Sequence, residues 1–408
     1  MVKYDDIVIL GQNHRAIGRD NFLLNFIAQF LGGMDEVEYD FGSAHYLFNA
    51  FQHVPDEPYD YLTQIIKKFG RREPLSQSDK QQISSFEEVV RKMLSDETTL
   101  DLSEHTFYGI DGSTRDALDI TLSSLVGVSA RKKIALPIPN WHFHEMSENA
   151  KKLYKFTYFE ALDEESLVNG FKKVAEKENV KILLLAMPAV PLMYNVSESA
   201  GKEMNDIALK HGIDIVIDDV LRGVQPMGQR NSIARYFTRP YIVEGFSKRF
   251  GDENFAHLSY VLTPHKGVKI RKFCESEEYN LIFGLGTKLA LSYASIPALE
   301  ELQMRNQAFD EGLLYDTAEG TLIRRPSTTH LTSLVEVPAN FKIKMQVFQQ
   351  ICFSNDIDIS IPSEYYPAQF SPSPSLERLF RITVGRMDVE KIYRGANILG
   401  NRIKRYSQ

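Results

Sequence analysis

The chain has 408 residues, 43% of them hydrophobic and 25% charged, with a formal net charge of −7. This length suits a large domain plus a smaller one, and the negative charge gives no general attraction to nucleic acid or anionic membranes; no apolar run approaches the ~20 residues of a membrane-spanning helix. Met1 to Asp6 lack the features of a signal peptide, and Cys274 and Cys352 lie in unrelated contexts, so we expect a cytoplasmic protein without a disulfide framework or metal cage.

The apolar pattern predicts an α/β sheet in the middle of the chain. The segment before Ser95 lacks strong strand signals and is expected to form an arm with helices. From about Leu100 to His265, short apolar runs alternate with amphipathic stretches, as in a sheet with helices on both sides. Two runs, 182–185 and 215–217, are apolar on both faces, which is typical of covered parallel strands. The predicted strands are 133–137, 153–159, 180–187, 213–217, 241–243 and 258–262, with helices between them such as 164–178 and 199–211.

The C-terminal part of the sequence predicts a separate α+β unit. A helical pattern from Leu285 to Asp310 is long enough to lead out of the large domain. After it, the predicted elements are strands at 331–337, 357–361 and 379–384, a helix at 342–355 and a terminal helix from Asp388. These strands and helices together predict a second, smaller core.

Ligands of α/β sheets bind beyond the carboxyl ends of the strands, and two groups of side chains are expected there. A hydroxyl-rich turn at Ser113 and Thr114 opens a helix; it either binds a phosphate through free N–H groups and hydroxyls or simply caps the helix. Trp141, the only tryptophan, follows two prolines at a strand-to-helix junction and either stacks on a flat heteroaromatic ring or fills the core. His142 and His144 have no third ligand nearby, so they indicate a metal site only weakly.

Three charged residues follow or occupy later predicted strands. Asp218 comes directly after a buried strand and either holds a pyridine nitrogen protonated or makes a helix cap or loop ion pair. Lys248 follows the next strand; an amine in a partly apolar pocket forms a Schiff base, whereas a loop lysine is merely solvated. Arg381 lies inside a strand of the smaller unit, where a guanidinium suits either a substrate carboxylate or a structural ion pair.

The order of these features resembles that of the fold-type I pyridoxal-phosphate enzymes, in the aspartate aminotransferase-like class I/II family, with this chain as a divergent member. The resemblance covers about Thr106 to Gly385 and rests on GSTRDAL, PNWHF, IDIVIDDVLRG, EGFSKRFG and LFRITVG. It implies an α/β large domain, with a mainly parallel seven-stranded sheet flanked by helices, plus a smaller α+β domain. The implied segments are 1–70 as an arm and part of the small domain, 71–300 as the large cofactor-binding domain and 301–408 as the C-terminal small domain.

The resemblance also implies a role for each candidate residue. Lys248 would form the Schiff base with pyridoxal 5′-phosphate and remove the α-proton of an amino-acid substrate. Asp218 would pair with the pyridinium nitrogen, and Arg381 would bind the substrate α-carboxylate. The remaining cofactor contacts would come from Ser113 and Thr114 at the phosphate and from Trp141 at the ring.

The sequence departs from the family pattern at both ends of the cofactor. Val190 stands where an asparagine normally bonds the phenolic oxygen, and Leu221 stands where a tyrosine does so. At the phosphate end, Ala256 replaces an arginine eight residues after Lys248, and Gly245 replaces a serine three residues before it. Three cations are candidates to replace the lost arginine: Arg222, Arg249 and His257.

We therefore expect a pyridoxal-phosphate-dependent aminotransferase acting on an α-amino acid, with a lyase, cyclase or oxidase as the alternative and a non-catalytic binding module of the same fold as a further one. The chain opens with acidic residues and without a basic helix-turn-helix extension, so no nucleic-acid partner is expected, and no membrane partner either. The resemblance implies a homodimer whose active sites borrow a residue from the partner; the candidates are Tyr46, Tyr59 and Tyr61.

Overall fold

The computed structural model describes residues 39–40, 50–70, 73–126, 132–141, 154–226, 228–250, 258–264, 277–313, 323–325, 329–354, 357–367, 369–385 and 387–408. A seven-stranded sheet lies at its centre, in the order β2-β8-β7-β6-β5-β3-β4. Only β8 runs antiparallel to its neighbours. The bounds are β2 Thr106–Asp111, β3 Lys132–Ile138, β4 Tyr154–Glu160, β5 Ile182–Ala186, β6 Asp214–Asp218, β7 Tyr241–Gly245 and β8 Leu258–Thr263. The predicted mainly parallel sheet is confirmed.

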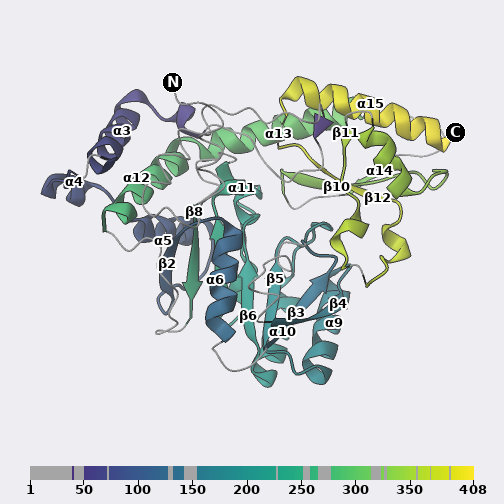
Figure 1. The fold of residues 1–408 in the computed structure, drawn as a ribbon, viewed down its shortest axis with the longest axis horizontal. Coiled ribbons are helices and arrows are strands. Elements are labelled where there is room, and N and C mark those ends of the chain that lie inside the picture. The colour runs from purple at the N-terminus through teal and green to yellow at the C-terminus, as the bar shows by residue number, and fades with distance from the viewer. Residues whose placement is uncertain are drawn as a thin grey trace, which may run out of the picture.

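Helices cover both faces of this sheet, which explains its apolar strands (Figure 1). Along β5, Leu183 and Leu185 belong to one hydrophobic core, while Ile182 and Leu184 belong to a second core on the other face. The first face packs against α5 (Phe86–Glu97), α9 (Glu164–Lys177) and α10 (Glu198–His211), and the second against α6 (Thr114–Val126). A strand buried on both sides needs apolar residues at every position, so the continuous runs are a consequence of this layering.

Local signals set the ends of the crossover helices. Asp163 and Ser197 cap the N-termini of α9 and α10 by accepting hydrogen bonds from the N–H groups of Ser166 and Ala200. Gly212 ends α10 with a φ of 61°, a left-handed conformation that glycine adopts without strain. Strand β6 begins two residues after this cap, so the chain is returned to the sheet in register.

Among the differences from the sequence-based expectation, two concern the sheet domain and the helix that leaves it. β2 was not among the predicted strands, because Gly109 weakens the strand signal. A Cβ at this position would lie 3.0 Å from the ring of Phe86, so the glycine allows a close contact between β2 and α5. The single long helix predicted from Leu285 to Asp310 is wrong in detail, because the structure has α12 (Glu277–Tyr293) and α13 (Ser295–Gly312), bent by 54°. Pro297 has no N–H to donate to the carbonyl of Tyr293, which interrupts the helix there.

No single helix among the described residues has the length and apolarity to cross a membrane; only the bent pair of 280–293 and 295–312 passes that test together, by length and composition alone.

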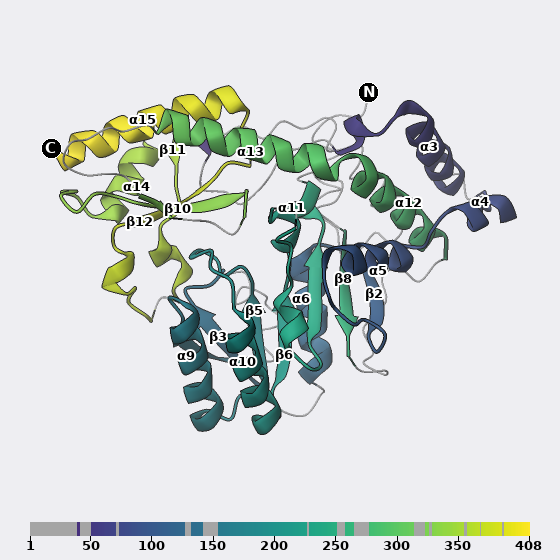
Figure 2. The same ribbon diagram turned by 180° about the vertical axis from the view of Figure 1, so that it is seen from behind.

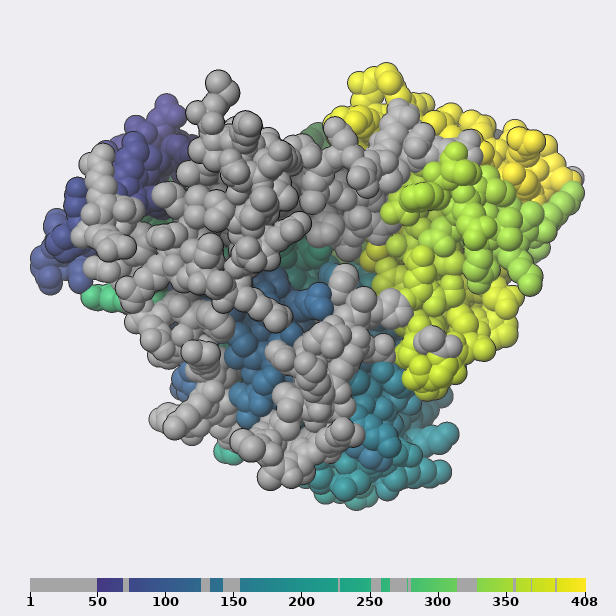
Figure 3. All heavy atoms as spheres, in the orientation of Figure 1, coloured from purple at the N-terminus to yellow at the C-terminus, as the bar shows by residue number. Residues whose placement is uncertain are grey.

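A smaller α+β unit lies beside the sheet domain, as Figures 2 and 3 show. Its three-stranded antiparallel sheet has the order β12-β10-β9, and a two-stranded parallel pair joins β1 to β11. Helix α13 leads from α12 to this unit and packs against α15. The bounds here are β1 Tyr39–Asp40, β9 Ile323–Arg325, β10 Thr332–Glu336, β11 Ile357–Asp358, β12 Leu379–Thr383, α14 Met345–Phe353 and α15 Val389–Ser407.

The remaining elements are short or peripheral. Helices α3 and α4 lie at the end of the molecule away from α15 in both ribbon views (Figure 2). A four-residue turn, α11, directly follows β7. The bounds are α3 Asp56–Gly70, α4 Gln77–Gln82, α11 Ser247–Phe250, η1 Ala50–His53, η2 Arg222–Val224, η3 Ile233–Tyr236, η5 Pro362–Tyr365 and η6 Pro374–Leu376.

Candidate active site

Lys248 lies at the carboxyl end of the sheet, on the short helix α11. Strand β7 ends at Gly245, and the N–H groups of Arg249 and Phe250 then bond to the carbonyl of Phe246. This turn buries Lys248, which is only 6% exposed, and places its Nζ 5.5 Å from the centre of the Trp141 ring. A lysine amine beside an aromatic face, with little access to water, is not a solvated loop lysine.

Burial is the main cause that lowers the pKa of Lys248, and the positive charge of Arg381 adds to it. The carboxylate of Asp218 opposes both effects, and the resulting pKa is about 8. An amine with a pKa of about 8 is partly unprotonated near neutral pH, and only the unprotonated amine is a nucleophile or a base. The site therefore holds a lysine suited to attack a carbonyl group.

Asp218 ends the neighbouring strand β6, in register with Val243 of β7. It is 3% exposed, and its carboxylate accepts a hydrogen bond from the N–H of Val220 at 3.2 Å. Asp219, the next residue, instead pairs with Arg222 at 3.1 Å. The two consecutive aspartates thus serve different partners, and Asp218 is the one whose charge acts on Lys248.

Arg381 reaches the site from the smaller unit. Its strand, β12, is buried along its whole length, and its Nη2 donates to the Oγ of Ser360 at 3.1 Å. The guanidinium carbon lies 5.2 Å from the centre of the Tyr365 ring. The carbonyl of Tyr365 accepts a hydrogen bond from the N–H of Asn140 at 3.0 Å, which joins the two units beside Trp141. Trp141, Asp218 and Arg381 therefore lie around Lys248, between the two units.

Ser113 and Thr114, the hydroxyl residues of the turn before α6, have different surroundings. Ser113 caps the helix: its Oγ bonds to the Asp116 carboxylate at 2.7 Å and accepts from the Asp116 N–H at 3.3 Å. The buried Oγ1 of Thr114 has no hydrogen-bond partner among the described residues. A Cβ on Gly245 would lie 2.1 Å from this oxygen. The Thr114 hydroxyl therefore fills the space that a side chain at position 245 would need, and it lies at the N-terminus of α6, the kind of position at which a phosphate group binds.

Two of the three candidates to replace the phosphate-binding arginine, Arg222 and Arg249, lie in the described part of the chain, and both are engaged with acidic residues. Both side chains are fully buried and are held by carboxylates. Arg249 donates to Glu97 at 2.5 and 2.8 Å and to Glu244 at 3.3 Å. Arg222 bonds to Glu97, Glu244 and Asp219. Because a buried guanidinium must be neutralised, these two arginines are committed to acidic partners and not to a phosphate.

We call this cluster the buried ion network and define it as Glu97, Asp219, Arg222, Arg230, Glu244 and Arg249. Three arginines face three acidic residues in it, so the charges balance. Burial raises the pKa of Glu97, but Arg249, Arg222 and Arg230 outweigh it and hold that pKa well below its ordinary value. Burial raises the pKa of Asp219. Sequence reasoning missed the network; the available signal was a glutamate inside the apolar strand 241–245.

Val190 and Leu221, which stand where the family has hydrogen-bond donors to the phenolic oxygen of the cofactor, are part of the hydrophobic core. Val190 and Leu221 are 6% and 5% exposed and belong to the same hydrophobic core. Neither side chain can donate a hydrogen bond. Several other residues considered above lie outside the described part of the chain: Tyr46, His142, His144, Ala256, His257 and Cys274.

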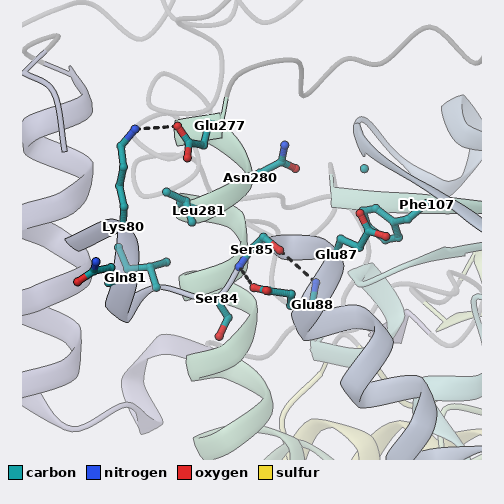
Figure 4. A pocket seen from close by; sticks show the side chains of 12 residues that line it. Lys80, Gln81, Ser84, Ser85, Glu87, Glu88, Phe107, Glu277, Asn280 and Leu281 are labelled. Atoms are coloured by element: carbon teal, nitrogen blue, oxygen red, sulfur yellow. Dashed lines mark hydrogen bonds and ion pairs between the residues drawn. The ribbon is translucent and has the colours of Figure 1, made fainter. Parts of the chain in front are cut away.

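A cavity of 710 Å³ lies away from Lys248, between α4, α5, α12 and β2. Figure 4 shows two interactions among its lining residues: Lys80 pairs with Glu277, and the carboxylate of Glu88 accepts a hydrogen bond from the N–H of Ser85. The candidate active site shares none of its lining residues.

No protein-family model and no curated protein matches the sequence. Solved structures do match over nearly the whole chain. They include an aromatic aminotransferase from Pyrococcus horikoshii (TM-score 0.68, 16% identity, 93% of this chain and 99% of that one). They also include a C–S lyase from Staphylococcus hominis with bound pyridoxal phosphate (0.67, 14%, 96% of each chain) and an aspartate aminotransferase from Thermus thermophilus (0.64, 12%, 91% and 100%). At such identities the likeness concerns the fold.

Proposed function

The chain has the fold-type I fold of the aspartate aminotransferase-like enzymes, in a divergent form, and we propose that it is a pyridoxal-phosphate-dependent enzyme acting on an α-amino acid. The observation that carries the proposal is the buried amine of Lys248, with Trp141, Asp218 and Arg381 around it. Ionisable groups with perturbed pKa values gather at active sites, and this lysine has a lowered pKa between two units of the fold. One fold hosts many activities, and it is these side chains that support this one.

Each residue has a defined task in this proposal. When bound, the cofactor supplies an aldehyde that condenses with amines and a conjugated ring that withdraws electrons from the substrate α-carbon. Lys248 would hold the cofactor through its neutral amine, and the same amine would serve as the base for the substrate α-proton. Asp218 holds a proton at the ring nitrogen, and Arg381 binds the substrate carboxylate. Trp141 covers the ring, and Thr114 donates its hydroxyl to the phosphate.

We propose amino-group transfer as the overall reaction, with Lys248 as the residue that carries the proton. The packing of Val190 and Leu221 favours a second candidate, a lyase, cyclase or oxidase, because a phenolic oxygen without donors from these positions changes the electronics of the ring. Incubating the purified protein with amino acids and 2-oxo acids separates the two. Labelled amino nitrogen found in a new amino acid supports transfer; ammonia or a cyclised product without transfer contradicts it.

A non-catalytic binding module of the same fold is the remaining alternative. We expect the purified protein to absorb visible light after it is mixed with pyridoxal phosphate. A protein that stays colourless and does not retain the cofactor on a desalting column would contradict the proposed enzyme.

We also propose that the enzyme is a homodimer, as the resemblance implies. Tyr59 and Tyr61 of the helix α3 are the described aromatic candidates for a contribution to the partner's site. Sedimentation analysis should give twice the 46.6 kDa mass of the chain. A species with the mass of one chain at micromolar concentration would contradict the dimer.

The rate of cofactor capture should rise with pH and level off above about 8, because capture uses the neutral amine of Lys248. Stopped-flow absorbance of the cofactor-free protein mixed with pyridoxal phosphate measures this rate. An ordinary lysine, with a pKa of about 10.4, would give a rate that still rises near pH 10. That behaviour would show that the amine is exposed in solution.

Thr114→Val should weaken pyridoxal-phosphate binding about tenfold or more, since a hydrogen bond to a charged group contributes about 1.5–3 kcal/mol. Equilibrium titration of the visible band measures the change. Thr121→Val is the matched control on the same helix, because the Oγ1 of Thr121 bonds to the carbonyl of Ala117 at 2.7 Å inside α6. Equal effects of the two substitutions would remove Thr114 from the phosphate site.

A further inference from the structure

We propose that Glu97 is a positioning residue for Lys248 and Asp218, a role that rests on the proposed function. Glu97 is the last residue of α5, on the face of the sheet opposite α6, and its side chain is 14% exposed. Its carboxylate accepts hydrogen bonds from Arg222, from Arg230 at 2.6 Å and from both terminal nitrogens of Arg249. One side chain thus holds three guanidinium groups from three separate segments.

Two members of the buried ion network directly follow the two residues that Glu97 is proposed to position. Asp218 is followed by Asp219, and Lys248 is followed by Arg249. The first member of each pair faces the site, and the second enters the buried ion network. Fixing Asp219 and Arg249 therefore fixes the backbone from which Asp218 and Lys248 project.

The two turns that carry these pairs touch each other directly. Asp219 donates its N–H to the carbonyl of Val243 at 2.8 Å, which ties the end of β6 to β7. A Cβ on Gly223 would lie 2.7 Å from the Cβ of Arg249, so η2 and α11 are in close contact. Glu97 binds the arginine of each turn, Arg222 and Arg249, and holds the two turns together from one side.

The turn that carries Lys248 needs such an anchor. Helix α11 has four residues, and a helix of one turn has no stability of its own. The two-pronged pairing of Arg249 with Glu97 is charge-assisted and directional, which makes it the kind of contact that fixes a backbone position. Around the amine itself, Trp141, Asp218 and Arg381 act on the side chain and not on the turn.

The first test uses the cofactor-free protein and does not depend on the proposed reaction. Formaldehyde with a borohydride reductant methylates neutral amines, and mass spectrometry of the peptide that contains Lys248 gives its labelling rate against pH. The wild-type midpoint should lie at about 8. In Glu97→Gln the turn that carries Lys248 loses its anchor and exposes the amine. We therefore expect the pH midpoint of Lys248 labelling to move toward the ordinary lysine pKa of about 10.4. The midpoint of Glu97→Asp should lie between those of the wild type and Glu97→Gln.

Leu399→Ala is the matched control for a loss of stability. Leu399 is fully buried in α15 of the C-terminal unit, so its truncation weakens the fold without touching the network. We expect the midpoint of Lys248 labelling to stay at about 8 in this variant. An unchanged midpoint in Glu97→Gln, or an equal shift in Leu399→Ala, would overturn the positioning role.

The second test uses the protein loaded with pyridoxal phosphate. Exchange of the α-proton in deuterated water is followed for the amino acid that the wild-type protein exchanges fastest. We expect Glu97→Gln to lower kcat about tenfold and to leave KM within about twofold, because Lys248 moves while Arg381 keeps its place. A wild-type value of kcat in this variant would overturn the proposal. Absence of exchange in the wild type would refute the proposed function, whereas the labelling comparison would still decide the role of Glu97.

Discussion

Lys248→Ala is expected to abolish the visible band of the bound cofactor and to lower the reaction rate about a thousandfold or more. The variant loses both the amine that attacks the aldehyde and the base that takes the α-proton, and general base catalysis alone contributes about 10²–10⁴-fold. Lys248 lies on the short helix α11 after the strand β7 and not within the sheet, so we expect the substitution to remove function and to leave the packing of the sheet intact. Absorbance after mixing with pyridoxal phosphate and α-proton exchange measure the two losses.

Lys202→Ala controls for the loss of a lysine as such. Lys202 lies on the exposed face of α10 and pairs with Glu198 four residues earlier, a kind of contact that contributes little. This variant should keep both the visible band and the exchange rate. A Lys248→Ala protein that retains a covalent cofactor, trapped by borohydride on another lysine, would place the reactive amine elsewhere.

Glu244→Gln is expected to lower the free energy of unfolding by about 3–5 kcal/mol. Glu244 is fully buried in β7 and accepts hydrogen bonds from Arg222, Arg249 and Tyr260. Removing its charge leaves an excess of buried positive charge, which is far more costly than removing an ion pair whole. Denaturant unfolding followed by circular dichroism measures the change.

Glu336→Gln is the matched control, a glutamate on another strand. It pairs with Arg378 at 2.5 Å, where that arginine is 48% exposed, so we expect a loss of at most about 1 kcal/mol. Comparable losses in the two variants would show that the network is solvated in solution.

The buried ion network also affects how the free energy of unfolding changes at acidic pH. The arginines hold the pKa of Glu97 well below its ordinary value of 4.5. A carboxyl group with a lowered folded-state pKa stabilises the fold above its unfolded-state pKa, and this stabilisation is lost as the pH falls toward the folded-state value. Unfolding free energies should therefore decline below about pH 4.5, and less steeply in Glu97→Gln.

The order of elements and the candidate reactive residues were accessible from the sequence because they depend on local signals. A strand covered on both faces must be apolar throughout, as at 182–185, and a capped helix needs a side chain such as Ser197 at its start. Lys248, Asp218 and Arg381 stood out because each charge follows or occupies an apolar strand. The fold class is confirmed; the exact domain boundaries and the individual site roles stay predictions.

Only the tertiary structure decided which charged side chains lie around Lys248 and which pair with one another in the buried ion network. The contact between Glu97 and Arg249 joins residues 152 positions apart, and no periodicity or spacing reports such a distance. For the same reason the sequence offered Arg222 and Arg249 as phosphate ligands, although acidic partners from α5 and β7 already neutralise them. Local sequence determines where a chain is apolar and where it turns; only packing determines which buried charges neutralise one another.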